Sequence, residues 1–183
     1  MATTKWALDP THSEIQFKVK HLMISKVTGQ FHKFDATVET EGHNLETAKV
    51  SFSADVSSIS TNNEQRDAHL RNSDFFDQEN HTHITFAGDK LEKVDEENYK
   101  LHGTLTMRGV SKAETFNVEF GGLITDPWGN TRVGFTLNGR IDRRNYGVSF
   151  GMVNETGGIL LGYDVDIHAQ AEFVEVKEPV AAA

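Results

Sequence analysis

The chain has 183 residues, of which 27 are acidic and 18 are lysine or arginine, so its formal net charge is −9. Nucleic acid and anionic bilayers are bound through positive surface, and this charge argues against either as the main partner, although local basic clusters remain compatible with it. The absence of cysteine excludes a disulfide framework and a thiol nucleophile.

The length and the uniform composition predict one domain over residues 1–177, followed by a loose tail over 178–183. The first six residues carry no apolar run of signal-peptide length, and the longest apolar runs are far shorter than a membrane span. We therefore expect a cytoplasmic protein with no stable membrane insertion.

The sequence begins with two predicted strands that are joined by a bend. Residues 14–21 alternate apolar and polar side chains with the two-residue period of a strand, and the apolar row ends in His21. A second strand over 27–38 keeps the alternation but shifts it by one position near His32 and Lys33, as a bulge would. Two long strands joined by one bend indicate the corner of a barrel.

A third strand at 48–56 precedes the one persuasive helix. Thr61 and Glu64 have the spacing of a capping box, and the residues up to position 70 are mostly good helix formers. A helix of this length is marginal in water, so it must pack on the rest of the fold. The expected anchors are Leu70, Phe75 and Phe76.

The remaining chain predicts more strands joined by short turns. The strands are expected at 83–88, 98–107, 116–120, 133–141 and 161–173, with turns at 93–98, 108–112 and 126–130. About eight long antiparallel strands and one helical insertion indicate an all-β barrel or sandwich. Long strands favour the barrel, because barrel strands are tilted and closure removes exposed edges.

Several short motifs occur in an order typical of one family. They are Trp6 to Ser13, Lys20 to Leu22, Gly29 to Phe31, Ser58 to Thr61, Arg66 to Leu70, Asp74 to Phe76, Gly103 to Val110 and Asn145 to Gly147. The chain resembles, from Trp6 to about Phe173, the YceI family of polyisoprenoid-binding, lipocalin-like proteins. The resemblance implies an extended eight-stranded antiparallel barrel that holds a long isoprenoid or fatty chain, often as a homodimer.

The inward apolar rows are candidates for the wall of a ligand channel. Alternation alone more often indicates a solid core, although eight-stranded barrels can be filled or hold one small ligand. The resemblance favours the hollow interior. The candidate channel residues are Phe17, Val19, Phe31, Val50, Phe52, Phe86, Leu105, Phe116, Val118, Phe135 and Leu137.

Four polar residues are candidates for contacts with a ligand head group: His21, Arg66, His69 and Arg108. His21 is otherwise a hydrogen-bonded core or rim residue, and Arg108 is otherwise structural. Arg66 and His69 lie three apart on the helix and can share the face toward the opening.

Other charged residues suggest ordinary surface roles. Asp67 and Arg71 are four residues apart and are expected to pair on the helix surface. Arg143 and Arg144 lie in a predicted connection and are expected to be solvated loop charges.

Catalysis and metal binding have weaker support. His12 with Ser13, or Asp67 with His69, could be fragments of a catalytic site, but no complete motif is present. Two histidines at positions 81 and 83 lack a nearby third ligand for zinc. We expect a binding protein without cofactor or metal, whose ligand is a polyisoprenoid, an isoprenoid quinone or a fatty-acid derivative. The alternatives are a scaffold barrel without a ligand and an enzyme acting on a lipid head group.

Overall fold

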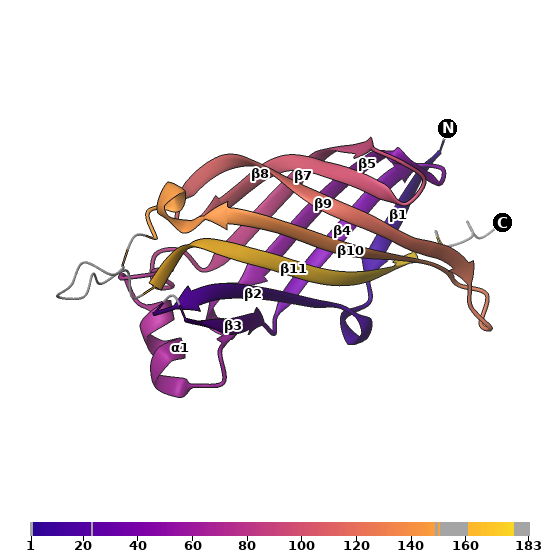
Figure 1. The fold of residues 1–183 in the computed structure, drawn as a ribbon. Coiled ribbons are helices and arrows are strands. Elements are labelled where there is room, and N and C mark those ends of the chain that lie inside the picture. The colour runs from indigo at the N-terminus through magenta and orange to yellow at the C-terminus, as the bar shows by residue number, and fades with distance from the viewer. Residues whose placement is uncertain (1, 23, 149, 151–160, 178–183) are drawn as a thin grey trace.

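The computed structural model describes residues 2–22, 24–148, 150 and 161–177. In chain order the elements are β1 (Thr3–Leu8), η1 (Pro10–His12), β2 (Glu14–His21), β3 (Ser25–Phe31), β4 (Phe34–Glu41), β5 (Asn44–Asp55), η2 (Val56–Ser58), β6 (Ile59–Ser60), α1 (Glu64–Arg71), β7 (His83–Lys93), β8 (Asn98–Met107), β9 (Val110–Thr125), β10 (Thr131–Asp142), η3 (Arg143–Tyr146) and β11 (Leu161–Glu175). Figure 1 labels α1 and every strand except β6. The predicted tail, residues 178–183, lies outside the described residues.

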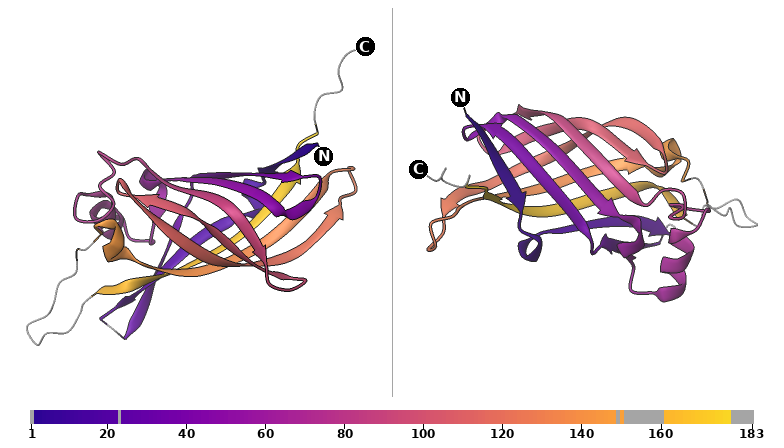
Figure 2. Two further views of the ribbon diagram at one scale, coloured as in Figure 1. Left: turned by 90° about the horizontal axis from the view of Figure 1, so that it is seen from above. Right: turned by 180° about the vertical axis from the view of Figure 1, so that it is seen from behind.

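Eight antiparallel strands close into a barrel, which confirms the predicted fold class. The order around the ring is β1-β4-β5-β7-β8-β9-β10-β11, and β1 closes it by pairing with β11. The closing register places Trp6 opposite Glu175 and Leu8 opposite Phe173. The strands wrap around an elongated interior, with α1 at one end and the start of β1 and the end of β11 at the other (Figure 1, Figure 2).

The first strands of the chain pair with different neighbouring strands on the two sides of a bend. After η1 the chain continues along β11 as β2, and β3 then pairs with β2 and β6, whereas β4 pairs with β1 and β5. The predicted bulge near His32 and Lys33 is therefore wrong. The two residues break the strand between Phe31 and Phe34, because the chain changes its partner there.

The helix begins later than the capping box predicted. Asn63 is the N-cap, and its side chain accepts a hydrogen bond from the Arg66 amide at 3.0 Å. The Thr61 hydroxyl donates to Asp67 at 2.6 Å, and the Thr61 amide also donates to this carboxylate. Asp67 is buried and occupied by these donors, so the predicted surface pair between Asp67 and Arg71 is also wrong.

The predicted turns at 93–98 and 126–130 are confirmed as hairpin connections. The connection expected over 108–112 is shorter: β8 ends at Met107, β9 begins at Val110, and Arg108 and Gly109 have φ of 52° and 74°. Two consecutive left-handed residues are the geometry of a tight hairpin turn. The strand β1 starts before Trp6, earlier than the sequence pattern indicated.

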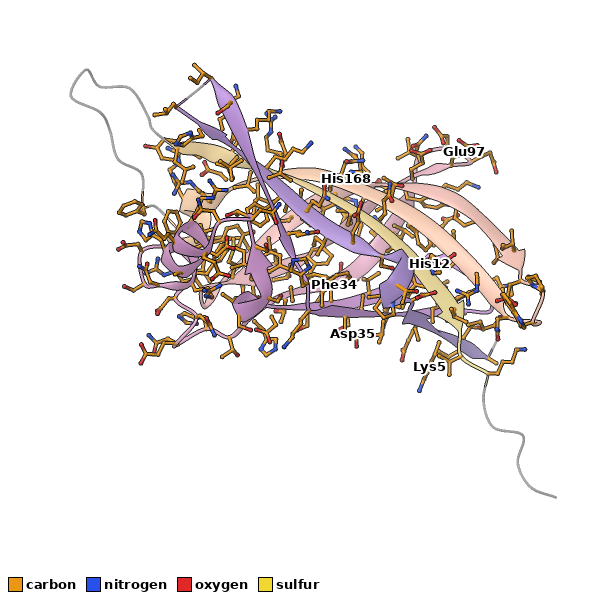
Figure 3. The ribbon with its side chains drawn as sticks, turned by 90° about the horizontal axis from the view of Figure 1, so that it is seen from below. Lys5, His12, Phe34, Asp35, Glu97 and His168 are labelled. Atoms are coloured by element: carbon orange, nitrogen blue, oxygen red, sulfur yellow. The ribbon has the colours of Figure 1, made fainter. Side chains whose placement is uncertain are left out.

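Strand residues alternate between the interior and the outside. On β4, Phe34 lines the interior whereas its neighbour Asp35 is exposed (Figure 3). The predicted helix anchors are confirmed, because Phe75 is buried and both Leu70 and Phe76 pack against the core. Among the described residues, no helix has both the length and the apolar character needed to span a membrane.

Candidate ligand cavity and its polar mouth

The barrel encloses a cavity of about 520 Å³. Eleven of the twelve phenylalanines line it, and so do all eleven apolar residues named above as candidate channel wall. The volume falls within the range of about 300–1,000 Å³ that is usual for small-molecule sites. The interior is therefore hollow, although the strand pattern alone also allowed a solid core.

Glycines on the inner face make room for the aromatic wall. A side chain at Gly29 would overlap the ring of Phe17, and one at Gly139 would overlap the ring of Phe116. The rings lie flat over these positions because no Cβ occupies them. Phe17 also packs against Phe31, with ring centroids 5.7 Å apart.

The cavity reaches the surface at the end of the barrel that carries α1, which we call the mouth. His21, Leu22 and Arg66 are exposed there and also line the cavity. His69 lines it too, from the inner side of the helix. The structure thus brings three of the four candidate head-group residues together at one opening.

Arg66 and Thr61 form one rigid polar unit at the mouth. The Arg66 Nε donates to the Thr61 hydroxyl at 2.7 Å, and its terminal nitrogen donates to the Thr61 carbonyl at 2.7 Å. Asp67 accepts from the same hydroxyl, so the arginine, the threonine and the carboxylate are linked in a chain. This chain holds the guanidinium beside the opening.

His69 lies in an aromatic cluster. Its ring centroid is 5.0 Å from those of both Phe75 and Phe150, in edge-to-face arrangements. Its Nε2 lies 2.9 Å from an oxygen of Asp74. The imidazole therefore presents an oriented polar group at the border between apolar wall and solvent.

Arg143 is a cavity residue that sequence reasoning missed. It was expected as a solvated loop charge, but its side chain is only 4% exposed and it lines the cavity. It donates to the carbonyls of Gly162 and Val148, each at 2.8 Å, and to those of Phe150 and Leu161. Burial lowers the pKa of its guanidinium.

A signal for Arg143 was present in the sequence. The inward row of β10 runs through positions 133, 135, 137, 139 and 141, and the next position in the same period is 143. Its neighbour Arg144 faces outward, as expected of a loop charge, and pairs with Asp142 at 2.7 Å. The Arg144 guanidinium also lies 4.0 Å from the ring centroid of Tyr163.

Arg108 lies outside the set of residues that line the cavity. Its guanidinium donates to the carbonyl of Phe75 at 3.1 Å and to that of Gly147 at 3.0 Å. The residue thereby connects the segment after α1 with the turn after η3. This geometry favours the structural role over a contact with the ligand.

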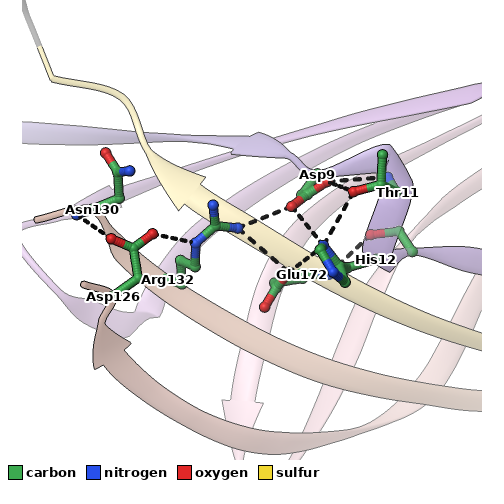
Figure 4. A network of polar contacts seen from close by, with 8 residues as sticks. Asp9, Thr11, His12, Asp126, Asn130, Arg132 and Glu172 are labelled. Carbon is green, nitrogen blue, oxygen red and sulfur yellow. Dashed lines mark hydrogen bonds and ion pairs between the residues drawn. The ribbon is translucent and has the colours of Figure 1, made fainter. Parts of the chain in front are cut away.

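A polar network on the outside of the barrel ties the corner at η1 to β10 and β11 (Figure 4). Arg132 donates to Asp9 at 2.9 Å and to Asp126 at 2.7 Å, and His12 Nδ1 lies 2.9 Å from Asp9 and 3.3 Å from Glu172. The hydrogen bond from His12 lowers the pKa of Asp9, and that from Arg132 lowers the pKa of Asp126 to about 2.

Potential metal ligands meet in this network, outside the cavity. Oxygen and nitrogen atoms of Asp9, His12 and Glu172 lie within 4.8 Å of one another. The Arg132 guanidinium already forms ion pairs with both carboxylates, with Asp9 at 2.9 Å and with Glu172 at 3.5 Å. A metal ion there would compete with an existing cation, so the network is best described as an ion-pair cluster.

The two possible catalytic fragments do not assemble within the described residues. His12 bonds Asp9, whereas the Ser13 hydroxyl accepts from the amide of Glu172. Asp67 bonds Thr61, whereas His69 bonds Asp74. Neither histidine is hydrogen-bonded to the partner that a nucleophile and base would require.

Comparisons with known proteins agree with this architecture. Residues 6–173 match the model of the YceI-like domain family. A UPF0312 protein of Staphylococcus aureus (strain MSSA476) is 42% identical over 171 residues, which cover 93% of this chain and 97% of the relative.

Two solved structures share the fold. The Campylobacter jejuni YceI protein has a TM-score of 0.74 and 33% identity, and the match covers 87% of this chain and 90% of that one. A polyisoprenoid binding domain from Saccharophagus degradans has a TM-score of 0.73 and 15% identity, and the match covers 93% of this chain and 98% of that one. The family match over nearly the whole barrel shows that the chain is a member of the YceI-like family.

Proposed function

We propose that the protein binds a long-chain amphiphilic lipid noncovalently inside its barrel, for storage or transport. The observation that carries the proposal is the cavity of about 520 Å³ walled by phenylalanine and aliphatic side chains. Each buried methylene of a ligand contributes about 0.8 kcal/mol, so such a wall can hold a chain without specific hydrogen bonds. The ligand class is a polyisoprenoid, an isoprenoid quinone or a fatty-acid derivative.

The polar end of the ligand would lie at the mouth, where the cavity changes from apolar to polar wall. His21, Arg66 and His69 line it there, and Arg143 lies beside them in the cavity wall. These side chains offer donors to a phosphate, a carboxylate or a quinone oxygen. The fold similarity to the polyisoprenoid binding domain of Saccharophagus degradans is consistent with a ligand of this class.

The proposal includes no catalytic step, metal or cofactor, and the protein would act in the cytoplasm. The homodimer implied by the resemblance stays a prediction, which sedimentation velocity of the purified chain would test.

Native mass spectrometry of protein purified from its source, followed by solvent extraction, tests the proposal. We expect a copurifying lipid that leaves the protein on extraction. Ala169→Trp fills the cavity, because Ala169 lines it, and should abolish copurification. His168→Trp places the same ring on the opposite side of β11 and should retain the lipid. A ligand-free wild type with no affinity for added isoprenoid or fatty acid would refute the proposal.

A further inference from the structure

We propose that the β2–β3 hairpin is a docking surface through which the mouth of the barrel binds an anionic lipid bilayer reversibly. The inference builds on the proposed function, since the bilayer would be the source or the acceptor of the ligand. It rests on separate observations, namely the charge, the exposed apolar side chains and the position of the hairpin. The hairpin lies at the same end of the barrel as α1 (Figure 2).

The hairpin is basic in a protein that is acidic. Between positions 18 and 26 the sequence has Lys18, Lys20, His21 and Lys26 and no acidic residue, although the formal charge of the chain is −9. The three lysines are exposed. An anionic bilayer attracts such a segment, and each lysine near the surface strengthens binding about fivefold.

Two of these lysines face each other across the strands. Lys20 is the cross-strand partner of Lys26, and like charges directly opposite are destabilising. Lysines also protect free strand edges from unwanted pairing, which accounts for Lys26 on β3. Edge protection does not account for Lys20, because β2 lies between β3 and β11. An anionic partner at the hairpin accounts for both.

The tip of the hairpin is apolar and exposed. Ile24 is 85% exposed and Leu22 is 43% exposed. Leu22 has φ of 54°, which is an unusual conformation for a bulky residue. Protection of a strand edge would not place an isoleucine in water, whereas a membrane interface takes up such a side chain.

Leu22 connects the exposed tip with the interior. The same side chain is exposed to solvent and lines the cavity, next to His21. A lipid leaving a bilayer in contact with Ile24 would therefore meet the apolar wall directly. Lys26 forms an ion pair with Asp166 at 3.9 Å, but this carboxylate also accepts a hydrogen bond from Arg140 at 2.7 Å. One negative charge is thus shared by two cations and leaves the hairpin positive.

Co-sedimentation of the full chain with vesicles tests the inference without any added ligand. Vesicles of phosphatidylcholine are compared with vesicles that contain equal amounts of phosphatidylcholine and phosphatidylglycerol, at low and high salt. We expect binding to the anionic vesicles alone and its loss at high salt, where screening shortens the reach of the charges. Lys20→Gln with Lys26→Gln should weaken this binding about twenty-fivefold.

Matched variants elsewhere on the barrel separate the hairpin from general charge and apolarity. Lys49→Gln with Lys100→Gln removes two exposed strand lysines outside the hairpin and should leave vesicle binding unchanged. Ile24→Ser should weaken it, whereas Ile124→Ser, at a residue 62% exposed at the far end of the barrel, should not.

Apart from a wild type that fails to bind anionic vesicles, three outcomes would overturn the inference. They are equal binding by the wild type and the Lys20/Lys26 variant, a loss caused by Ile124→Ser instead of Ile24→Ser, and hairpin variants that change only the oligomeric state. The last would assign the hairpin to a second copy of the chain. Lipid that still copurifies with a protein unable to bind vesicles would leave the proposed function intact while refuting the docking surface.

Discussion

Arg143 joins the two chain segments beside the mouth through hydrogen bonds to four carbonyl oxygens. The donors are aimed at Val148 and Phe150 on one side and at Leu161 and Gly162 on the other. A guanidinium can do this because its five N–H groups are held in a planar fork. The position of Arg143 thus couples the stability of the barrel end to the shape of the candidate site.

Replacing Arg143 should destabilise the protein much more than replacing its neighbour. Arg143→Met leaves carbonyl groups without donors in a buried place, and we expect a loss of about 3 kcal/mol in the free energy of unfolding. Arg144→Met removes an exposed ion pair with Asp142, which solvent screens, so we expect a much smaller loss. Urea unfolding followed by circular dichroism measures both, and equal losses would contradict the role given to Arg143.

The outer network makes the stability contribution of His12 depend on pH. The hydrogen bond to Asp9 is the largest cause that raises the pKa of His12. A raised pKa in the folded state contributes stability that is fully present below the unfolded value of about 6.5 and is lost as pH rises through the folded value. Above that range this contribution is absent.

We expect the pKa of His12 to lie above the usual value of about 6.5 in the folded protein. In Asp9→Asn the pKa of His12 should move back toward this usual value. NMR titration of the histidine ring signals measures both values. In denaturant unfolding at a series of pH values, His12→Asn should flatten the decline on the alkaline side. A wild-type His12 that titrates at or below the usual value would contradict this reading of the network.

At the scale of the elements, the two-residue period predicted where strands lie and which side chains face inward. All eleven candidate wall residues line the cavity because the period depends only on local backbone geometry. The sequence showed an irregularity between Phe31 and Phe34 but not its cause. A bulge and a change of partner strand both shift the apolar alternation by one residue, so the pattern cannot distinguish them. Likewise, Thr61 bonds Asp67 instead of capping the helix, which depends on burial of that carboxylate.

Glycine on the inner face of β10 offers a test of the packing between strands. A Cβ at Gly139 would overlap the Phe116 ring, so Gly139→Ala should cost about 1–3 kcal/mol through overpacking. Gly134→Ala on the same strand is the control, because no atom lies within 4 Å of its Cβ position. Thermal or urea unfolding should show a loss for the first variant and little or none for the second; equal effects would refute the packing argument.

At the scale of the whole molecule, closure of the barrel was predictable and the cavity was not. Long alternating strands favour a closed ring, and the pairing of β1 with β11 provides it. The width left between opposite walls depends on how rings such as Phe116 lie over glycines, which no local pattern specifies. Family resemblance, rather than periodicity, favoured the hollow interior.

A ligand in the cavity should stabilise the entire barrel, because the unfolded chain has no cavity to bind it. At a free lipid concentration of about 100 times Kd, binding adds about 2.7 kcal/mol to the free energy of unfolding. For a chain of this size that corresponds to a rise in Tm of about 5–10 °C. Differential scanning calorimetry of extracted protein, with and without an added isoprenoid or fatty acid, measures the shift. Ala169→Trp should show no shift and His168→Trp the full one; equal shifts in both would place the lipid outside the barrel.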